Sequence, residues 1–160
     1  MKKVSKKSKK ICFIASSGGH LEQIKQLKKV EKKYECFYIT NKTLSTEKMQ
    51  EKKYLVNDLY RGKSRCKKVL RIIKMFFEQI NIYIQEKPEV IITTGAGIAI
   101  PMCLIAKIFR KKVIYIESFA RINSTNKSGE FIYKFSDVFI VQWKSLMKFY
   151  PKAIYGGWIY

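Results

Sequence analysis

A chain of 160 residues, 47% of them hydrophobic, is long enough for one domain with a substantial core and too short for two full domains with a cleft between them. The formal net charge of +21, carried mostly by lysine, predicts a surface that attracts polyanions: nucleic acid, anionic lipid headgroups or phosphorylated substrates. The four cysteines are scattered and the chain holds a single histidine, so no metal site is expected and the thiols suit a reducing cytosol.

Residues 1–10 form a basic stub rich in lysine and serine, and we expect one domain over 11–160. The apolar run 11–15 is too short for the core of a signal peptide. The longest uncharged run, 90–106, contains threonines, glycines and Pro101, so a strand, a turn and the start of a helix explain it better than a transmembrane helix. No transmembrane helix is expected, and binding to a membrane surface stays open.

The first expected element is a strand at 10–16, a nearly continuous apolar run of the kind that is buried on both faces of a parallel sheet. It leads directly into the sequence S-S-G-G-H at 16–20, and an amphipathic helix is expected over 21–33. A glycine pair between a buried strand and a helix leaves backbone N–H groups open. Such a turn favours an anion, most often a phosphate.

The next elements are a strand at 35–40 and, within the polar segment 41–58, a short strand at 54–56. A long helix is expected over 64–85, with basic residues crowded in its first half and an apolar arc wider than one core-facing stripe requires. Such a helix can lie in a membrane interface, or it can be buried between the sheet and a neighbouring element. The residues leave both interpretations open.

Pro88 ends that helix, and a strand is expected at 89–94, followed by a second glycine turn, G-A-G, at 95–97 and a helix over 98–109. The remaining pattern predicts a strand at 113–116, a polar loop at 118–129, a short helix from Glu130, a strand at 137–142, a short helix at 144–150 and a last strand at 153–155.

Strands that alternate with helices indicate an α/β fold, here a single Rossmann-like, doubly wound parallel sheet with right-handed crossovers. In such a sheet the strands at 10–16 and 89–94 lie side by side where the winding reverses. Ligands bind beyond the carboxyl ends of the strands at that point. Both glycine turns fall there, and Glu117 joins them from the end of the strand at 113–116.

Neither of two common nucleotide-binding motifs is present. The first turn lacks G-x-G-x-x-G, the strand at 35–40 does not end in an acidic residue, and no G-x-x-x-x-G-K-[ST] occurs. We therefore expect no nicotinamide, flavin or other cofactor and no P-loop. What is left is a glycine-rich anion turn that carries a histidine and faces a second glycine turn and a carboxylate, a set that suits a substrate bearing a phosphate or pyrophosphate.

The candidate roles follow from the residue types. Backbone N–H groups of the first turn could hold phosphates, and His20 could hydrogen-bond them or accept a proton from a sugar hydroxyl. Glu117 could orient that hydroxyl or act as the base. Each role has an alternative: His20 could cap the helix start, Glu117 could be a capping or salt-bridged surface carboxylate, and Gly95 and Gly97 could serve strand–helix packing alone.

Four segments together carry a resemblance to a known family: S-S-G-G-H-L at 16–21, T-T-G-A-G at 93–97, Y-I-E-S-F-A-R at 115–121 and F-I-V-Q-W at 139–143. They resemble, in this order, the family of the acceptor-side subunit of the two-chain glycosyltransferase of the dolichol pathway (asparagine-linked glycosylation protein fourteen). Its bacterial relatives of the PssD type act in capsular and exopolysaccharide assembly. The resemblance extends from residue 11 to the C-terminus.

The resemblance implies a GT-B glycosyltransferase split over two chains. This chain would be equivalent to the N-terminal half of MurG-type enzymes and would bind a polyprenyl-pyrophosphate-linked sugar at the cytoplasmic face of the plasma membrane. A separate donor-binding subunit would hold the nucleotide sugar, and inverting transfer would need no metal. The positions carried over are His20 and Glu117 as catalytic candidates, and Ser17, Gly18, Gly19, Gly95, Gly97 and Arg121 as substrate-binding candidates.

Eukaryotic members of that family carry an N-terminal membrane anchor, whereas only residues 1–10 precede the first strand here. Membrane attachment would then come from the helix at 64–85, from lysines or from the partner. The chain ends in Trp158, Ile159 and Tyr160, where a fused enzyme would continue into its second domain. This tail is predicted to pack against the partner; the alternative is a strand end folded on its own core.

Three hypotheses follow. The leading one is a peripheral membrane subunit that positions a lipid-linked sugar for a partner enzyme in surface polysaccharide biosynthesis and has little or no activity alone. The second is a scaffold that recruits and enhances the partner without touching substrate. The third, nucleic-acid binding through lysines, leaves the two glycine turns unexplained, so no nucleic-acid partner is expected.

Overall fold

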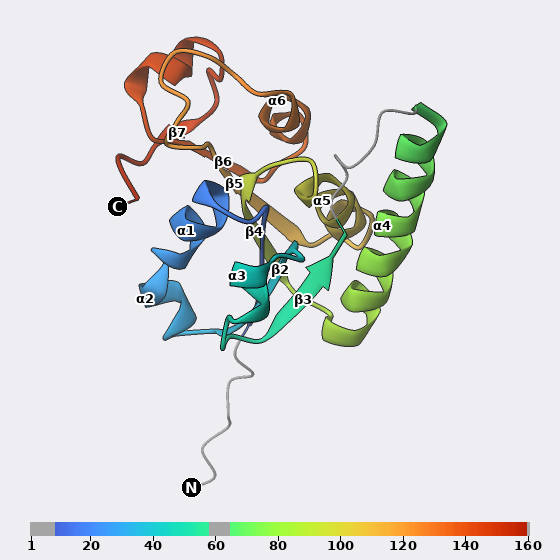
Figure 1. Ribbon diagram of the computed structural model, residues 1–160. Coiled ribbons are helices and arrows are strands. Elements are labelled where there is room, and N and C mark those ends of the chain that lie inside the picture. Colours follow the sequence, from blue (N-terminus) through green and yellow to red (C-terminus); the bar gives the residue numbers. More distant parts are fainter. Residues whose placement is uncertain (1–8, 58–64, 160) are drawn as a thin grey trace, which may run out of the picture.

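The computed structural model describes residues 9–57 and 65–159 and has a central parallel sheet with helices on both faces (Figure 1). The strand order is β3-β2-β1-β4-β5-β6-β7, so the winding reverses between β1 and β4, as expected. The strands are β1 Lys10–Ala15, β2 Glu35–Asn41, β3 Lys53–Val56, β4 Val90–Gly95, β5 Lys112–Ile116, β6 Val138–Val141 and β7 Ile154–Tyr155. The α/β, doubly wound fold predicted from the sequence is confirmed.

The sheet separates two apolar cores, because successive side chains of a strand point to opposite faces. In β1, Cys12 and Ile14 belong to the larger core, whereas Ile11, Phe13 and Ala15 belong to the smaller one. Burial on both faces explains the continuous apolar run that marks β1 in the sequence.

Helices α4 and α5 cover one face of the sheet, and α1 and α2 cover the other (Figure 1). No helix in the described parts of the chain is both long enough and apolar enough to cross a bilayer. The helices are α1 Gly19–Lys25, α2 Lys28–Glu31, α3 Leu44–Glu47, α4 Arg65–Glu86, α5 Ala99–Ile108, α6 Lys127–Tyr133 and the 3₁₀ helix η1 Lys144–Lys148.

The single helix expected over 21–33 is wrong: α1 ends at Lys25 and α2 begins at Lys28. The apolar residues of this segment recur at every third position. At roughly 100° per residue, a continuous helix would place Val30, nine residues after Leu21, on the opposite side of the helix from Leu21. A break with two tight turns, in which the amide of Gln26 donates to the Gln23 carbonyl and that of Leu27 to the Ile24 carbonyl, brings the apolar residues back toward the sheet.

Two further helices differ from the expectation because side-chain caps decide where they begin. Helix α3, within the polar segment after β2, was not expected; Thr43 caps it and forms a reciprocal capping box with Thr46. Helix α6 begins before Glu130, because the Asn126 side chain accepts a hydrogen bond from the Gly129 amide.

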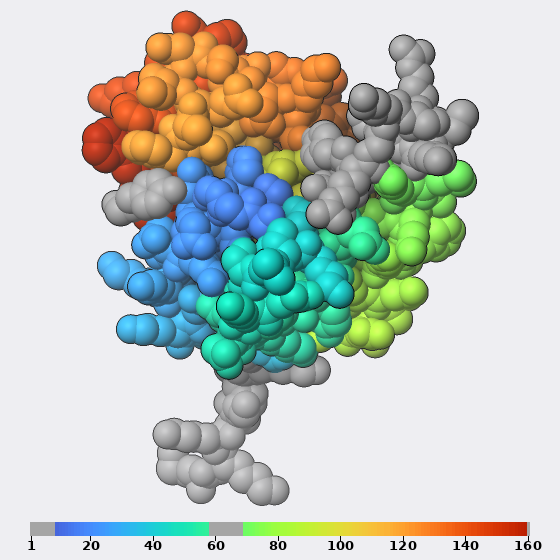
Figure 2. Space-filling view, in the orientation of Figure 1, coloured from blue at the N-terminus to red at the C-terminus, as the bar shows by residue number. Residues whose placement is uncertain are grey.

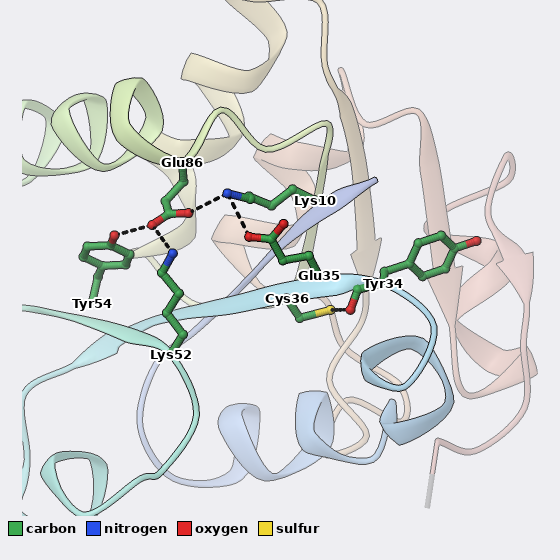
Figure 3. A network of polar contacts seen from close by, with 7 residues as sticks. All are labelled: Lys10, Tyr34, Glu35, Cys36, Lys52, Tyr54 and Glu86. Carbon is green, nitrogen blue, oxygen red and sulfur yellow. Dashed lines mark hydrogen bonds and ion pairs between the residues drawn. The ribbon is translucent and has the colours of Figure 1, made fainter. Parts of the chain in front are cut away.

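An ion-pair network around the buried Glu86 carboxylate fixes the end of α4 to the amino ends of the strands (Figure 3). The Glu86 carboxylate is paired with Lys10 at 3.1 Å and with Lys52 at 2.6 Å, and it accepts a hydrogen bond from the Tyr54 hydroxyl. Lys10 also contacts Glu35, at 2.9 Å. These bonds hold the pKa of Glu86 low, at about 2, against the effect of burial, which would raise it. Lys10, counted in the basic stub, is therefore part of the folded domain.

Candidate functional site

The first glycine turn lies at the surface where β1 ends. Gly18 is the N-cap of α1 and has a φ of 88°, in the left-handed region that favours glycine. A Cβ atom at Gly18 or at Gly19 would meet nothing within 4 Å, and both residues are exposed. Ser17 is half-buried beside them. The turn is therefore open to a ligand on its outer side.

His20 is bonded across the switch point of the sheet. Its Nδ1 lies 2.8 Å from the Thr94 carbonyl oxygen, and the Thr94 hydroxyl donates to the His20 carbonyl oxygen, also at 2.8 Å. A carbonyl oxygen can only accept, so Nδ1 carries the proton and Nε2 is the acceptor of the neutral ring. The alternative that His20 caps its own helix is not seen, because its partner is on β4.

Burial lowers the pKa of His20 below the ordinary value of 6.5, and the Arg121 charge lowers it further, while the bond to Thr94 acts in the opposite direction. The ring is therefore neutral at neutral pH. A neutral imidazole whose Nε2 is unprotonated can accept either a proton or a hydrogen bond.

The second glycine turn is a packing surface. Gly95 has a φ of 109°, and a Cβ atom there would lie 2.6 Å from the Tyr115 hydroxyl and 3.6 Å from Cε1 of His20. Its amide already donates to the Thr93 hydroxyl, and both Gly95 and Gly97 are buried. These observations favour the packing role; contact of either glycine with substrate stays a prediction.

Glu117 lies beneath the surface with none of its area exposed. Oε1 accepts hydrogen bonds from the Ser118 amide at 2.8 Å and from Asn126 Nδ2 at 2.6 Å, and Oε2 accepts one from the Tyr150 hydroxyl at 3.1 Å. Burial raises the pKa of this carboxyl group, and these bonds oppose the rise. The alternative of a salt-bridged surface carboxylate is therefore wrong, and direct contact of Glu117 with a sugar hydroxyl stays a prediction.

Arg121 is exposed on the loop that Glu117 holds. Its amide donates to the Ser118 carbonyl at 2.9 Å, and its guanidinium contacts the Ser124 hydroxyl at 3.4 Å. Its positive charge lowers the pKa of both His20 and Glu117. Figure 2 shows the start of α1 against the residues that follow β5. The predicted site residues thus form an accessible layer (the first turn, His20 and Arg121) above a buried one (Glu117 and the second turn).

Two glutamines that the sequence interpretation left without a role tie this site together. Gln23 Oε1 accepts from the Phe119 amide and from Gln142 Nε2, each at 3.3 Å. Gln142 Nε2 also donates to the Glu117 carbonyl at 2.9 Å, and its Oε1 accepts from the Ile159 amide at 3.0 Å. Each residue had one feature that could have marked it as part of the site. Gln23 is a polar residue at a buried helix position, and Gln142 lies in the F-I-V-Q-W segment.

The C-terminal tail folds back over the same edge of the sheet. Ile159 packs against the smaller core, and the Trp158 ring lies 5.7 Å from that of Phe119 and 5.2 Å from that of Trp143. Trp158 is nevertheless 61% exposed. The tail is thus partly folded on its own core, as in the alternative; Tyr160 lies outside the described residues, and contact with a partner stays a prediction.

No group of three or more histidine, cysteine, aspartate or glutamate side chains within 9–57 and 65–159 could hold a metal ion.

The winding order and a candidate site at its reversal define a Rossmann-like α/β domain. The fold is similar to that of MurG from Acinetobacter baumannii, with a TM-score of 0.65 and 15% identity over 84% of this chain and 41% of MurG. It is also similar to UDP-N-acetylglucosamine 2-epimerase from Rickettsia bellii, with a TM-score of 0.68 and 12% identity over 90% of this chain and 41% of the epimerase.

The chain belongs to the family described as oligosaccharide biosynthesis protein Alg14 like, whose model matches residues 11–159. The UDP-N-acetylglucosamine transferase subunit ALG14 of Homo sapiens is 39% identical over 77 residues, which cover 44% of this chain and 36% of the human protein. The subunit of the same name from Yarrowia lipolytica is 29% identical over 172 residues, 92% of this chain and 80% of that protein. The matched region is thus about a third of the human relative's length, and the family resemblance inferred from the sequence is confirmed.

Proposed function

We propose that this chain is the acceptor-binding subunit of a two-chain glycosyltransferase. The complex transfers a sugar from a nucleotide sugar to a polyprenyl-pyrophosphate-linked sugar in surface polysaccharide biosynthesis, at the inner face of the plasma membrane. The observation that carries this proposal is the family match over 11–159, because the curated relatives are named as transferase subunits. The single Rossmann-like sheet, which matches 41% of MurG, supports a half-enzyme.

The accessible layer of the site suits a diphosphate. The turn with Ser17, Gly18 and Gly19 offers backbone amides to phosphate oxygens, and the exposed Arg121 guanidinium supplies a positive charge that also acts on His20. The donor-binding partner holds the nucleotide on the opposite side. The site is therefore complete only in the complex.

His20 has two candidate roles, which differ in the atom that Nε2 meets. As a base, Nε2 takes the proton of the acceptor hydroxyl while the hydroxyl oxygen forms a bond to the anomeric carbon and the bond from that carbon to the nucleoside diphosphate breaks. As a ligand, Nε2 accepts a hydrogen bond from a protonated phosphate oxygen and only positions the acceptor. The bond from Nδ1 to Thr94 fixes the ring for either role.

Glu117 is assigned a positioning role. Its carboxylate is buried and holds Ser118 and Asn126, the two ends of the loop that carries Arg121. A substitution at Glu117 therefore acts on substrate through the placement of Arg121. The exposed Trp158 ring, beside Phe119 and Trp143, is proposed as part of the surface that meets the donor-binding subunit.

The test is to purify the chain alone and in complex with its donor-binding subunit, and to follow sugar transfer from labelled nucleotide sugar to a polyprenyl-pyrophosphate-linked acceptor. We expect transfer by the complex and little or none by either chain alone. Robust turnover by this chain alone contradicts the proposal. If the His20→Ala and Arg121→Ala complexes assemble and keep full activity, the scaffold hypothesis replaces it.

A further inference from the structure

The outer face of α4 carries large apolar side chains in contact with solvent. Leu70, Phe77 and Ile84 are 66%, 62% and 56% exposed, and Ile73 between them is 46% exposed. Their spacing of three, four and seven residues places them on one side of the helix. We call these four residues the apolar stripe; the opposite side of α4, with Met75, Gln79, Ile82 and Glu86, is buried against the domain.

A basic groove of about 630 Å³ borders the stripe, between α4 and α3 at the carboxyl ends of β2 and β3. At roughly 100° per residue, Lys74 lies about 60° from Phe77 around the helix axis. Because Lys74 lines the groove, the apolar stripe and the groove are adjacent. The groove is lined by Asn41, Lys42, Thr43, Leu44, Glu47, Asn57, Arg71, Lys74, Met75 and Glu78.

The charges of the groove are not all satisfied within the domain. Lys42 pairs with Glu47 at 3.4 Å, whereas neither Arg71 nor Lys74 makes an ion pair with any residue that the structure describes. Glu78 is the remaining acidic group of the lining.

We propose that the apolar stripe and the basic groove together form a face that docks on an anionic lipid bilayer, with the stripe at the boundary of headgroups and acyl chains and with Arg71 and Lys74 paired to lipid phosphates. An amphipathic helix with basic residues beside its apolar face has the chemistry of such an interface. A second copy of this chain is a poor occupant, because it would bring together two surfaces of the same strong positive charge, from chains of +21 each.

This inference rests on the proposed function and deepens it, because it names the surface that meets the membrane. The groove lies at the carboxyl edge of the sheet, where β2, next to β1, ends. The first glycine turn and His20 follow β1 at the same edge. A lipid-linked acceptor held in the bilayer would therefore present its headgroup on the side of the molecule that carries the site.

The test is flotation of the full chain with vesicles of phosphatidylcholine alone or of phosphatidylcholine mixed with phosphatidylglycerol. We expect binding to the anionic vesicles, and about a tenfold or greater loss of affinity when Ile73→Ser and Phe77→Ser remove two apolar contacts. The pair Arg71→Gln and Lys74→Gln is expected to remove most of the preference for phosphatidylglycerol.

The chain offers matched controls at the other end of the sheet and on its other face. Ile154→Ser with Tyr155→Ser removes two exposed residues of β7, and Lys28→Gln with Lys29→Gln removes two exposed charges of α2. Both control pairs are expected to bind vesicles like the unmodified chain. Circular dichroism melts confirm that each variant is folded before its binding is compared.

Three results would overturn the inference: stripe variants that bind anionic vesicles like the unmodified chain, stripe variants whose only change is the loss of a dimer in sedimentation, or vesicle binding that inorganic phosphate abolishes at constant ionic strength. The last result would identify a site for free phosphate and not a bilayer surface. Transfer activity of the unmodified complex, measured separately in detergent, decides the proposed function, so either proposal can fail while the other stands.

Discussion

His20 and Thr94 exchange two hydrogen bonds across the switch point, side chain to backbone in both directions and each 2.8 Å long. They join the first residues of α1 to the end of β4, two segments that are 74 residues apart in the chain. This relationship fixes both the orientation of the imidazole ring and its tautomer. It also leaves Nε2 as the unprotonated nitrogen of the ring, the atom proposed to meet the substrate.

Replacement of His20 by alanine is expected to lower transfer by the complex by about 10²- to 10⁴-fold if the ring is the base. The pH profile distinguishes the roles. A base must be unprotonated, so activity falls with decreasing pH through the lowered pKa of His20, below 6.5. If His20 is only a diphosphate ligand, the His20→Asn or His20→Gln complex recovers much of the activity that His20→Ala loses. The fall of activity at acidic pH is then the same with and without the imidazole.

Because the pKa of His20 is lower in the folded than in the unfolded chain, the unfolded chain binds more protons between those two values. The contribution of His20 to the free energy of unfolding is therefore present above the unfolded pKa, near 6.5, and is lost as the pH falls below that value. His20→Gln removes this contribution, so the melting temperature of the variant should change less between about pH 7.5 and about pH 5.5, roughly one unit to either side of the ordinary His pKa of 6.5. An unchanged difference contradicts the assignment.

Glu86 is expected to stabilise the fold through the ion pairs of its buried carboxylate, and Glu86→Gln should lower the free energy of unfolding by about 2 kcal/mol because Lys52 loses its partner and Lys10 keeps only Glu35. The folded pKa of about 2 lies below the ordinary glutamate value of 4.5, so this stabilisation is present above pH 4.5 and is lost as the pH falls toward 2. Urea unfolding at several pH values measures both effects. Glu35→Gln, at a carboxylate that is 53% exposed, is the matched control and should cost less than about 0.5 kcal/mol.

Gly95→Ala should destabilise the domain by about 2 kcal/mol or more, because alanine is strained at a φ of 109° and its Cβ would lie 2.6 Å from the Tyr115 hydroxyl. Gly19→Ala, where a Cβ meets nothing within 4 Å, should leave stability unchanged or slightly higher. Thermal unfolding of both variants gives the comparison. Equal melting temperatures would mean that the second turn does not need its glycine.

Glu117→Gln should weaken the loop that carries Arg121, because an amide NH₂ replaces one oxygen that now accepts a hydrogen bond. A positioning role predicts a raised KM for the acceptor with a smaller change in kcat, and the pH profile set by His20 is kept. A base role predicts the opposite: a loss of kcat at unchanged KM. Steady-state kinetics of the complex decides between them.

Trp158→Ala should weaken binding to the donor-binding subunit by about tenfold or more, the effect typical of a large aromatic residue at an interface. The ring is 61% exposed in the isolated chain, so stability should change little. Tyr155→Ala, at an exposed aromatic residue of β7, serves as the control. Undiminished binding by a chain that lacks residues 156–160 would exclude the tail from the interface.

Several features of this fold could be predicted from local patterns. The strands, the two glycine turns and their meeting point follow from apolar runs, from glycine after a strand and from the right-handed winding of parallel sheets. The break between α1 and α2 was missed because no glycine or proline marks it; only the three-residue spacing of the apolar positions signals it. The start of α6 was missed because an asparagine cap, Asn126, lies within a polar loop.

The sequence by itself determined the α/β order, the family and the positions that gather at the switch point, because periodicity, glycine turns and motif order are properties of neighbouring residues. Only the tertiary structure decided that His20 is held by Thr94, that Glu117 is a buried carboxylate and not a surface one, and that one side of α4 faces solvent. The physical reason is that burial and these hydrogen bonds depend on contacts between segments far apart in the chain, and a residue's type alone does not say which of its faces the fold will cover.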